Sequence, residues 1–447
     1  MDDDPIHFNV WYDEERIRNS RAILVGVYRK PSELDTANEH LEELSLLSET
    51  HHINVVESWP AMVRDFSPGT FLSSGKLAQL KTRIAEVNAN LVIFDDEITA
   101  VQDRNLEEAL RVPVVDRTEI ILGVFADRAK TREAKLQIEM AQVQYLSPRL
   151  KRMWLHLSRQ AGGGGGMAGG GYTRGMGEKQ IEMDRRDLKR RYEQLQKELK
   201  GVVKSRETQR RRREKNQIPA FAIVGYTNAG KSTLLNTLTD ADVLVEDMLF
   251  ATLDTTTRQF ILPNHQKVLL IDTVGFIRKL PHLLVAAFKS TLEEAVQADV
   301  LLHLIDSSHP KALEQAKTTF EVLEELNAEK RPVITLINKV DLATTPAERS
   351  TIQKLRFSYP GAIQISATTG EGKEELFAAM MNVLRDRRQR LQIKIPQEKY
   401  DVVAKIIREG EIFSKKYVEN DVVVDVELPT VFAQQLVQYA YDDKQGT

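Results

Sequence analysis

Apolar and polar positions follow two alternating patterns through the first part of the chain. Short apolar runs, which predict buried strands, are separated by stretches such as 41–47 and 77–87, where apolar residues recur at helical spacing. This order predicts a parallel sheet with helices on its faces, an N-terminal α/β domain over residues 1–128. The expected strands are 23–27, 53–56, 91–94 and 112–115.

Three acidic residues follow the third of these strands. Asp95, Asp96 and Glu97 lie where the strand meets the edge of the expected sheet, and ligands of parallel sheets bind at such edges. A solvated strand end accounts for the same residues. We favour this second interpretation over a binding site.

The spacing of apolar residues changes after residue 128. They recur every three to four residues over 136–157, with a kink expected at Ser147-Pro148. After a loop they recur every seven residues over 181–202. Two such helices joined by one loop predict an antiparallel helical hairpin over residues 129–215.

The loop of this hairpin is rich in glycine. Residues 162–177 contain 10 of the 23 glycines in the chain. One interpretation is a flexible linker. The other is a loop with little side-chain bulk that enters a narrow site and becomes ordered there. Composition alone does not choose between them.

Positive charge is concentrated in the expected hairpin. The 447 residues include 62 Lys and Arg against 65 Asp and Glu, a formal net charge of -3. Residues 128–215 hold 24 of the basic and 10 of the acidic residues, an excess of 14, so the remainder carries -17. This imbalance favours a polyanion partner over a solvated coiled-coil surface, and RNA suits arginines beside a glycine loop. The candidate RNA-binding residues are Gly162, Gly166, Gly171, Arg174, Arg210, Arg211, Arg212 and Arg213.

Composition excludes several classes of protein. The sequence has no cysteine, which excludes disulfides, thiolate metal sites and cysteine nucleophiles. The acidic start at Met1–Pro5 lacks the basic and apolar regions of a secretory signal. No run approaches the roughly 20 apolar residues of a transmembrane helix. We therefore expect a cytoplasmic protein, and a monomer.

A phosphate-binding motif opens a second α/β pattern at residues 216–390. The motif G-x-x-x-x-G-K-S lies between an expected strand at 220–224 and an expected helix at 232–238. Its backbone N–H groups and the helix N-terminus surround phosphates, while Lys231 reaches the β- and γ-phosphates and Ser232 binds Mg²⁺. The expected phosphate-binding residues are Gly225, Tyr226, Thr227, Asn228, Ala229, Gly230, Lys231, Ser232 and Thr233.

Three further motifs, each after an expected strand, specify GTP. A carboxylate at Asp272 can hold Mg²⁺, and the amide of Gly275 can meet the γ-phosphate. Asp341 can accept hydrogen bonds from guanine N1–H and its 2-amino group, which adenine lacks. A backbone N–H of Ser366-Ala367 can bind guanine O6. The motif residues are Asp272, Thr273, Val274 and Gly275; Asn338, Lys339 and Asp341; and Ser366 and Ala367.

The catalytic residues expected from these motifs are Lys231, Thr252 and Gly275. Thr252 lies in a threonine-rich segment at 250–257 and is expected on Mg²⁺ with Ser232 and Asp272, although Thr255, Thr256 and Thr257 are alternatives.

Two further positions bear on the rate of hydrolysis. Phe276 replaces the water-orienting glutamine of Ras-like enzymes, so hydrolysis by the protein alone should be slow. Asn228 could hold a K⁺ ion near the phosphates, or could be a structural loop residue.

With these motifs established, the chain resembles the HflX family, bacterial translational GTPases of the Obg–HflX group. The resemblance rests on the GTPase motifs and on short motifs outside them. These are Gly225–Thr233, Phe250–Asp254, Asp272–Ile277, Asn338–Asp341, Arg117–Glu119, Phe125-Ala126, Thr131–Glu133, Leu157–Gln160 and Glu182–Arg186.

The resemblance implies an α/β multidomain protein with four parts. These are the N-terminal parallel α/β domain, the antiparallel helical hairpin, a P-loop Ras-like GTPase domain at 216–390, and a small C-terminal α/β domain at 391–447. The pattern of the last part reads strand, helix, two strands, helix.

The resemblance also implies partners and an activity. It implies binding of GTP and GDP, of the large ribosomal subunit and its rRNA, and of 70S ribosomes, which the GTP-bound protein would split when they are stalled or idle. Ribosomes would stimulate hydrolysis. The alternatives are an assembly factor for the large subunit that does not split ribosomes, an RNA-remodelling ATPase in the N-terminal half, and a coiled-coil adaptor. Mg²⁺ is the expected cofactor, and K⁺ is an open alternative.

Overall fold

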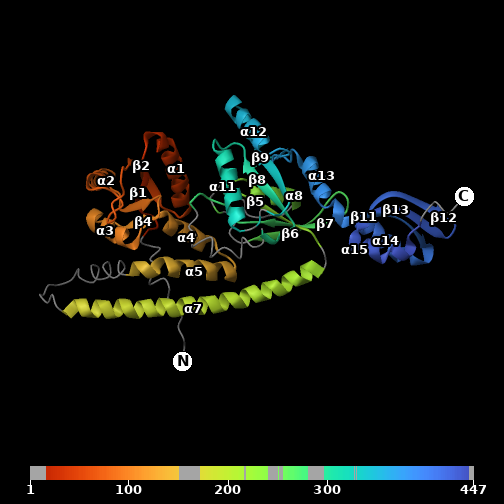
Figure 1. Ribbon diagram of the computed structural model, residues 1–447, viewed down its shortest axis with the longest axis horizontal. Helices are drawn as coiled ribbons and strands as arrows, with labels where there is room; N and C mark the ends of the chain where they lie inside the picture. Colours follow the sequence, from red (N-terminus) through yellow and green to blue (C-terminus); the bar gives the residue numbers. More distant parts are fainter. Residues whose placement is uncertain are drawn as a thin grey trace. The chain divides into compact units, whose positions relative to one another are not determined.

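The computed structural model describes residues 17–150, 172–215, 218–239, 250, 255–279, 296–326, 328 and 330–441. The chain forms two compact units (Figure 1). The first comprises residues 1–209 with the segments 246–254 and 279–290. The second comprises residues 210–245, 255–278 and 291–447. Among the described helices, none is long and apolar enough to cross a bilayer.

The first unit contains a parallel four-stranded sheet in the order β2-β1-β3-β4. Strands β1 and β3 are buried along most of their length, as expected of a parallel sheet covered on both faces. Helices α2 and α3 pack on one face through a core that includes Leu80 and Leu106. The elements are β1 Arg21–Tyr28, α1 Leu34–Thr50, β2 Asn54–Met62, α2 Ser74–Glu86, β3 Leu91–Phe94, α3 Ala100–Leu110, β4 Val114–Asp116 and α4 Arg117–Arg128.

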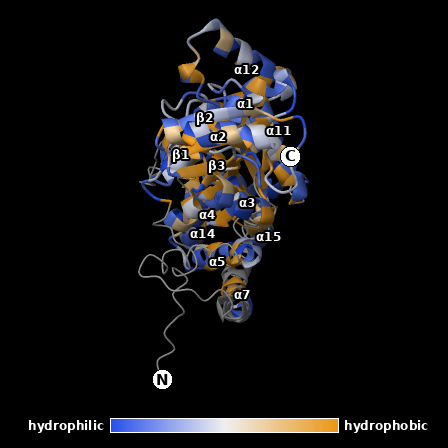
Figure 2. Ribbon diagram, turned by 90° about the vertical axis from the view of Figure 1, so that its left-hand side faces the viewer, coloured by the Kyte–Doolittle hydropathy of each residue, from blue (hydrophilic) through white to orange (hydrophobic). Residues whose placement is uncertain are grey.

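Helix α5 (Arg132–Leu146) lies side by side with helix α7 (Tyr172–Lys215), which belongs to the same unit as far as residue 209 (Figure 1). Arg191 on α7 pairs with Glu139 on α5, and Arg132 pairs with Glu198. These pairings run in opposite directions along the two helices, so the helices are antiparallel. In Figure 2, the described part of α7 contains both hydrophobic and hydrophilic residues. The apolar seam between the helices consists of Leu136, Val143, Leu150, Leu188 and Leu195.

A buried polar network fixes the end of α5 to the sheet. The Tyr145 hydroxyl donates to Asp116 Oδ1 at 3.1 Å, and Arg149 Nη2 donates to Asp116 Oδ2 at 3.3 Å. Arg149 also donates to the carbonyl oxygen of Ile98 at 2.6 Å. Burial raises the pKa of Asp116 to about 6, although the Arg149 charge opposes this change. Because both Asp116 oxygens accept hydrogen bonds from side chains at the end of α5, the network joins this end of the hairpin to the sheet.

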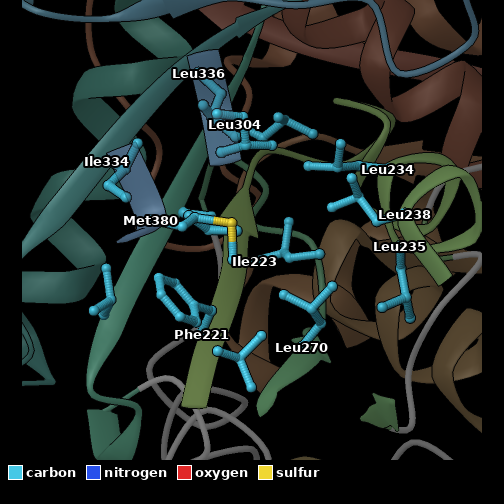
Figure 3. Close-up of a cluster of buried hydrophobic side chains, with 14 of the residues drawn as sticks. Phe221, Ile223, Leu234, Leu235, Leu238, Leu270, Leu304, Ile334, Leu336 and Met380 are labelled. Atoms are coloured by element: carbon cyan, nitrogen blue, oxygen red, sulfur yellow. The ribbon is translucent and has the colours of Figure 1, made fainter. Parts of the chain in front are cut away.

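The second unit contains a six-stranded sheet in the order β10-β9-β8-β5-β7-β6, parallel except for β6. Its core gathers around Phe221 and Ile223 of β5 (Figure 3). The elements are β5 Ala220–Gly225, α8 Lys231–Thr239, β6 Thr256–Ile261, β7 Lys267–Asp272, β8 Val300–Asp306, α11 Ala312–Glu325, β9 Val333–Asn338, η5 Val340–Leu342, α12 Pro346–Ser358, β10 Ile363–Gln364 and α13 Lys373–Val383.

The C-terminal part of this unit is an antiparallel sheet in the order β11-β13-β12 with a core of its own. In β13, buried residues from Val422 to Leu428 alternate with half-buried ones, the period-two pattern of a sheet with one covered face. The elements are β11 Arg388–Pro396, α14 Tyr400–Glu409, β12 Glu411–Val418, β13 Asp421–Pro429 and α15 Thr430–Gln435.

This architecture confirms the expected fold class, with two differences of detail. The α-helix α5 ends at Leu146 and gives way to a 3-10 turn at Ser147–Arg149, because Pro148 cannot continue the α-helical hydrogen bonding. The favoured interpretation of Asp95 as part of a solvated strand end is wrong. Asp95 is 2% exposed and paired with Arg117 and Lys279, whereas Glu97 is exposed.

Candidate functional site

The phosphate loop connects β5 to α8 at the carboxyl edge of the six-stranded sheet. Asn228 at its crest has a φ of +59°, a left-handed conformation that asparagine tolerates better than most residues. Gly230 has a φ of +93°, and a Cβ there would lie 2.5 Å from Asn338 Nδ2. Both the backbone conformation and the lack of space therefore require glycine at position 230.

Lys231 begins α8 beneath this loop. Its ammonium group donates to the carbonyl oxygen of Tyr226 at 2.8 Å and to that of Gly225 at 3.3 Å. Burial lowers the pKa of Lys231 to about 8, and the nearby Asp272 charge only partly compensates. These bonds aim the ammonium group along the inside of the loop, where phosphates are expected.

Ser232 and Asp272, both expected to bind Mg²⁺, come together from different elements. Ser232 lies in α8 and Asp272 ends β7, and Ser232 Oγ is 2.6 Å from Asp272 Oδ2. A hydroxyl and a carboxylate are the hard oxygen donors that Mg²⁺ prefers when phosphates and waters supply its other ligands. The pair therefore fits Mg²⁺, which would neutralise developing phosphate charge. Among the described residues, no cluster of three acidic or histidine side chains offers a rival metal site.

Asn338 joins the phosphate loop to the base-binding loop. Its side chain is 1% exposed, and its Nδ2 donates to the carbonyl oxygen of Ala229 at 2.8 Å. Its Oδ1 accepts from the amide of Ala367 at 2.9 Å. This asparagine therefore organises the loops, and the Ala367 amide must exchange Asn338 for guanine O6 if it is to bind the base.

The other base-binding residues lie around Asn338. Asp341 is exposed in the 3-10 turn η5, where its carboxylate is accessible to a base. Lys339 has a φ of +63°, and its ammonium group lies 2.7 Å from Asp306 Oδ2. The amide of Ser366 donates to the carbonyl oxygen of Glu371 at 3.1 Å. Asp306 is not among the residues expected from the sequence, although it ends the apolar run that becomes β8.

The segment after Asp272 packs directly on the phosphate loop. The Phe276 amide donates to the Gly225 carbonyl at 3.1 Å, and the Phe276 carbonyl accepts from the Thr227 amide at 2.7 Å. A Cβ at Gly275 would lie 2.8 Å from Thr227 Cγ2, so this close approach requires glycine. The Phe276 side chain is 1% exposed and offers no polar group to a water molecule.

Some expected site residues lie outside the part of the chain that the structure describes. These include Thr252 and the glycines Gly162, Gly166 and Gly171. Arg174 and Arg210–Arg213 lie on α7, where only the helical backbone is described. Of the alternatives to Thr252, Thr256 and Thr257 lie in β6 opposite Asp272 and Ile271, while Thr255 directly precedes that strand.

A phosphate loop between strand and helix, a serine–aspartate pair and an asparagine-organised base site define a P-loop GTPase. The chain belongs to the HflX family. It is 46% identical to the GTPase HflX of Chlamydia pneumoniae over 92% of this chain and 86% of that protein. It is 45% identical to the GTPase HflX of Akkermansia muciniphila over 94% of this chain and 97% of that protein. It therefore binds GTP and GDP and hydrolyses GTP.

Family models agree with this assignment. Residues 38–126 match the model described as GTP-binding GTPase N-terminal, and residues 128–213 match GTP-binding GTPase Middle Region. Residues 220–339 match 50S ribosome-binding GTPase. A GTP-binding protein from Sulfolobus solfataricus, solved with GDP, is 25% identical, with a TM-score of 0.41 over 82% of this chain and 99% of that one.

The pKa of Lys231 predicts a pH dependence of GTP binding. The ammonium form attracts phosphate and is populated below pH 8, so affinity should fall as pH rises through about 8, approaching tenfold per pH unit above it. Titration with a fluorescent GTP analogue between pH 7 and 9 measures this fall. The Lys231→Met variant controls for ionisation of guanine, and an equal pH slope in both proteins would contradict the prediction.

Replacement of Asp341 should change base specificity. In Asp341→Asn the amide no longer accepts both guanine donors, so we expect GTP affinity to fall at least about 100-fold and xanthosine triphosphate to become the better ligand. Competition binding with the two nucleotides measures this preference. Asp386→Asn, which changes an exposed carboxylate elsewhere, should keep the preference for GTP. An unchanged preference in Asp341→Asn would remove Asp341 from the base site.

Proposed function

We propose that this GTPase is a cytoplasmic factor that binds the large ribosomal subunit and dissociates stalled or idle 70S ribosomes. The observation that carries the proposal is the charge of α7, which belongs to the same chain as a domain of the 50S ribosome-binding GTPase family. Over residues 182–204 the exposed acidic side chains are Glu182 and Glu193. The exposed cations there are Arg185, Arg186, Lys189, Arg190, Lys197, Lys200 and Lys204.

The arrangement of these cations supports contact with a polyanion. Arg190, Lys197 and Lys204 are seven residues apart, so they share one face of the helix. The apolar seam with α5, which includes Leu188 and Leu195, lies on another face. Because the seam holds α7 in place, the basic face is left exposed, and each phosphate it meets releases condensed cations. The rRNA contacts expected of the glycine-rich loop stay a prediction, because Gly162, Gly166 and Gly171 lie outside the described residues.

The site supports a role for hydrolysis as a timer. Phe276 is buried and apolar, so position 276 supplies no side chain for orienting the attacking water. In the proposed cycle, GTP orders the protein and the hairpin docks on the large subunit, straining the subunits apart. The ribosome then stimulates hydrolysis, and the factor leaves.

Sedimentation of 70S ribosomes tests the proposal. With a non-hydrolysable GTP analogue, the protein should convert 70S particles to subunits on a sucrose gradient, and ribosomes should accelerate GTP turnover. The double variant Arg190→Glu, Lys197→Glu should bind at least about tenfold more weakly because the basic face loses its attraction for phosphates. Lys317→Glu, Lys354→Glu reverses two exposed lysines of the GTPase domain and should bind normally.

The outcomes separate the proposal from the main alternative. Intact 70S particles together with unaccelerated hydrolysis would contradict the proposal. Binding confined to immature large subunits would favour the assembly factor that does not split ribosomes.

We propose in addition that Asn228 holds K⁺ beside the phosphates. Its side chain is exposed at the crest of the loop, and its left-handed backbone also supports a structural role. Asn228→Gly keeps that backbone accessible but removes the oxygen. Hydrolysis by the unmodified protein should be faster in KCl than in NaCl, and Asn228→Gly should lose this difference. A variant that keeps the difference would make the asparagine purely structural.

A further inference from the structure

A short segment of the GTPase sequence contacts the N-terminal α/β domain within the first compact unit. Lys279 follows Phe276 by three residues, yet it belongs to the same unit as β3. Its Nζ lies 2.5 Å from Asp95 Oδ2 and 2.7 Å from Asp96 Oδ1. The chain that leaves the catalytic motif is therefore attached to the end of β3.

Asp95 is itself held by a second cation. Arg117 Nη1 donates to Asp95 Oδ1 at 2.8 Å, and Arg117 also pairs with Glu43. His40 Nδ1 lies 3.6 Å from Asp95 Oδ2. Burial acts to raise the pKa of Asp95, but the charges of Arg117 and Lys279 outweigh it and lower the pKa. Asp95 is therefore a charged group in a fixed position.

The same network continues into the hairpin. Arg117 directly follows Asp116, whose carboxylate accepts from Tyr145 and Arg149 at the end of α5. Asp95, Arg117 and Asp116 are each at most 3% exposed. Buried ion pairs and hydrogen bonds on Asp116 and on Arg117, two consecutive residues of the chain, thus link the hairpin to Lys279.

An aromatic contact attaches a second segment to the same helix. Phe125 of α4 meets Phe250 edge to face, with ring centroids 4.5 Å apart, and Phe250 is 2% exposed. Phe250 opens the threonine-rich segment in which Thr252 is expected to bind Mg²⁺. Helix α4 begins at Arg117, so the same helix contacts Phe250 directly and is linked to Lys279 through Asp95.

We propose that Asp95 is a positioning residue for GTP hydrolysis. Through Lys279 it fixes the segment that contains Gly275 and Phe276, and the buried network transmits docking of the hairpin to that segment. Buried Phe276 orients no water, so the proposal assigns faster hydrolysis to a rearrangement of this segment. The attachment opposes that movement until docking shifts the network. The docking step rests on the function proposed above, whereas the attachment does not.

Steady-state kinetics of three variants test the role of Asp95. Asp95→Asn and Lys279→Met should each raise kcat of the protein alone by at least about fivefold with KM for GTP unchanged, and lower the stimulation by ribosomes in proportion. Lys279→Arg keeps the charge and should retain most of the normal behaviour. Glu57→Gln breaks the ion pair of Glu57 with Arg83, at another place in the same domain, and should change neither value.

Separate readouts keep the two proposals distinguishable. If ribosomes fail to stimulate the unmodified protein, the proposed function fails, but kcat of the protein alone still tests Asp95. Lys279 is less buried than Asp95, so Lys279→Met provides the test if Asp95→Asn does not fold. If folded Lys279→Met has the same kcat and the same stimulation by ribosomes as the unmodified protein, the positioning role is overturned.

A double-mutant cycle tests the link to the hairpin. Tyr145→Phe removes the hydroxyl that bonds to Asp116 and Glu119. If the network is continuous, the effects of Tyr145→Phe and Asp95→Asn on ribosome stimulation should be non-additive. Independent, multiplicative effects would overturn the transmission from the hairpin and leave the role of Asp95 to the kinetic test.

Discussion

The nucleotide site depends on the side chain of Asn338. One buried amide group bonds to the phosphate loop at Ala229 and to the base-binding loop at Ala367, so the distance between phosphate and base recognition is set by a single residue. The glycine at position 230 follows from the same constraint, because any side chain there would displace this amide. Loops from three different strands thereby act as one rigid site.

Charge distribution imposes the second constraint. The chain is nearly neutral as a whole, but the hairpin is basic and the remainder is acidic. The apolar seam of the hairpin lies on another face of α7 and leaves its cations exposed. The same unit also buries several charges at the end of its parallel sheet. Those charges are paired almost completely, as burial requires. In the proposed function the exposed charges meet a polyanion, whereas the buried charges pair with one another inside the unit.

Much of this could be predicted from sequence. Local sequence patterns were enough to predict the strands, the hairpin and the phosphate loop, because each of these depends on apolar periodicity or on a contiguous motif. Prediction failed for Asp95, whose partner Lys279 lies 184 positions further along the chain. It also missed Asp306, the partner of Lys339. Only the fold brings such pairs together, and a carboxylate at a strand end looks the same in sequence whether it is solvated or neutralised.

The length of α7 has a mechanical consequence. Its 44 residues form one uninterrupted α-helix, which at 1.5 Å per residue extends for about 66 Å. A rod of that length converts rotation into displacement, so a tilt of about five degrees at one end moves the other by roughly 6 Å. A small angular change at the base of the hairpin can leave side-chain packing there intact. At the tip, the same change would produce a displacement longer than a hydrogen bond.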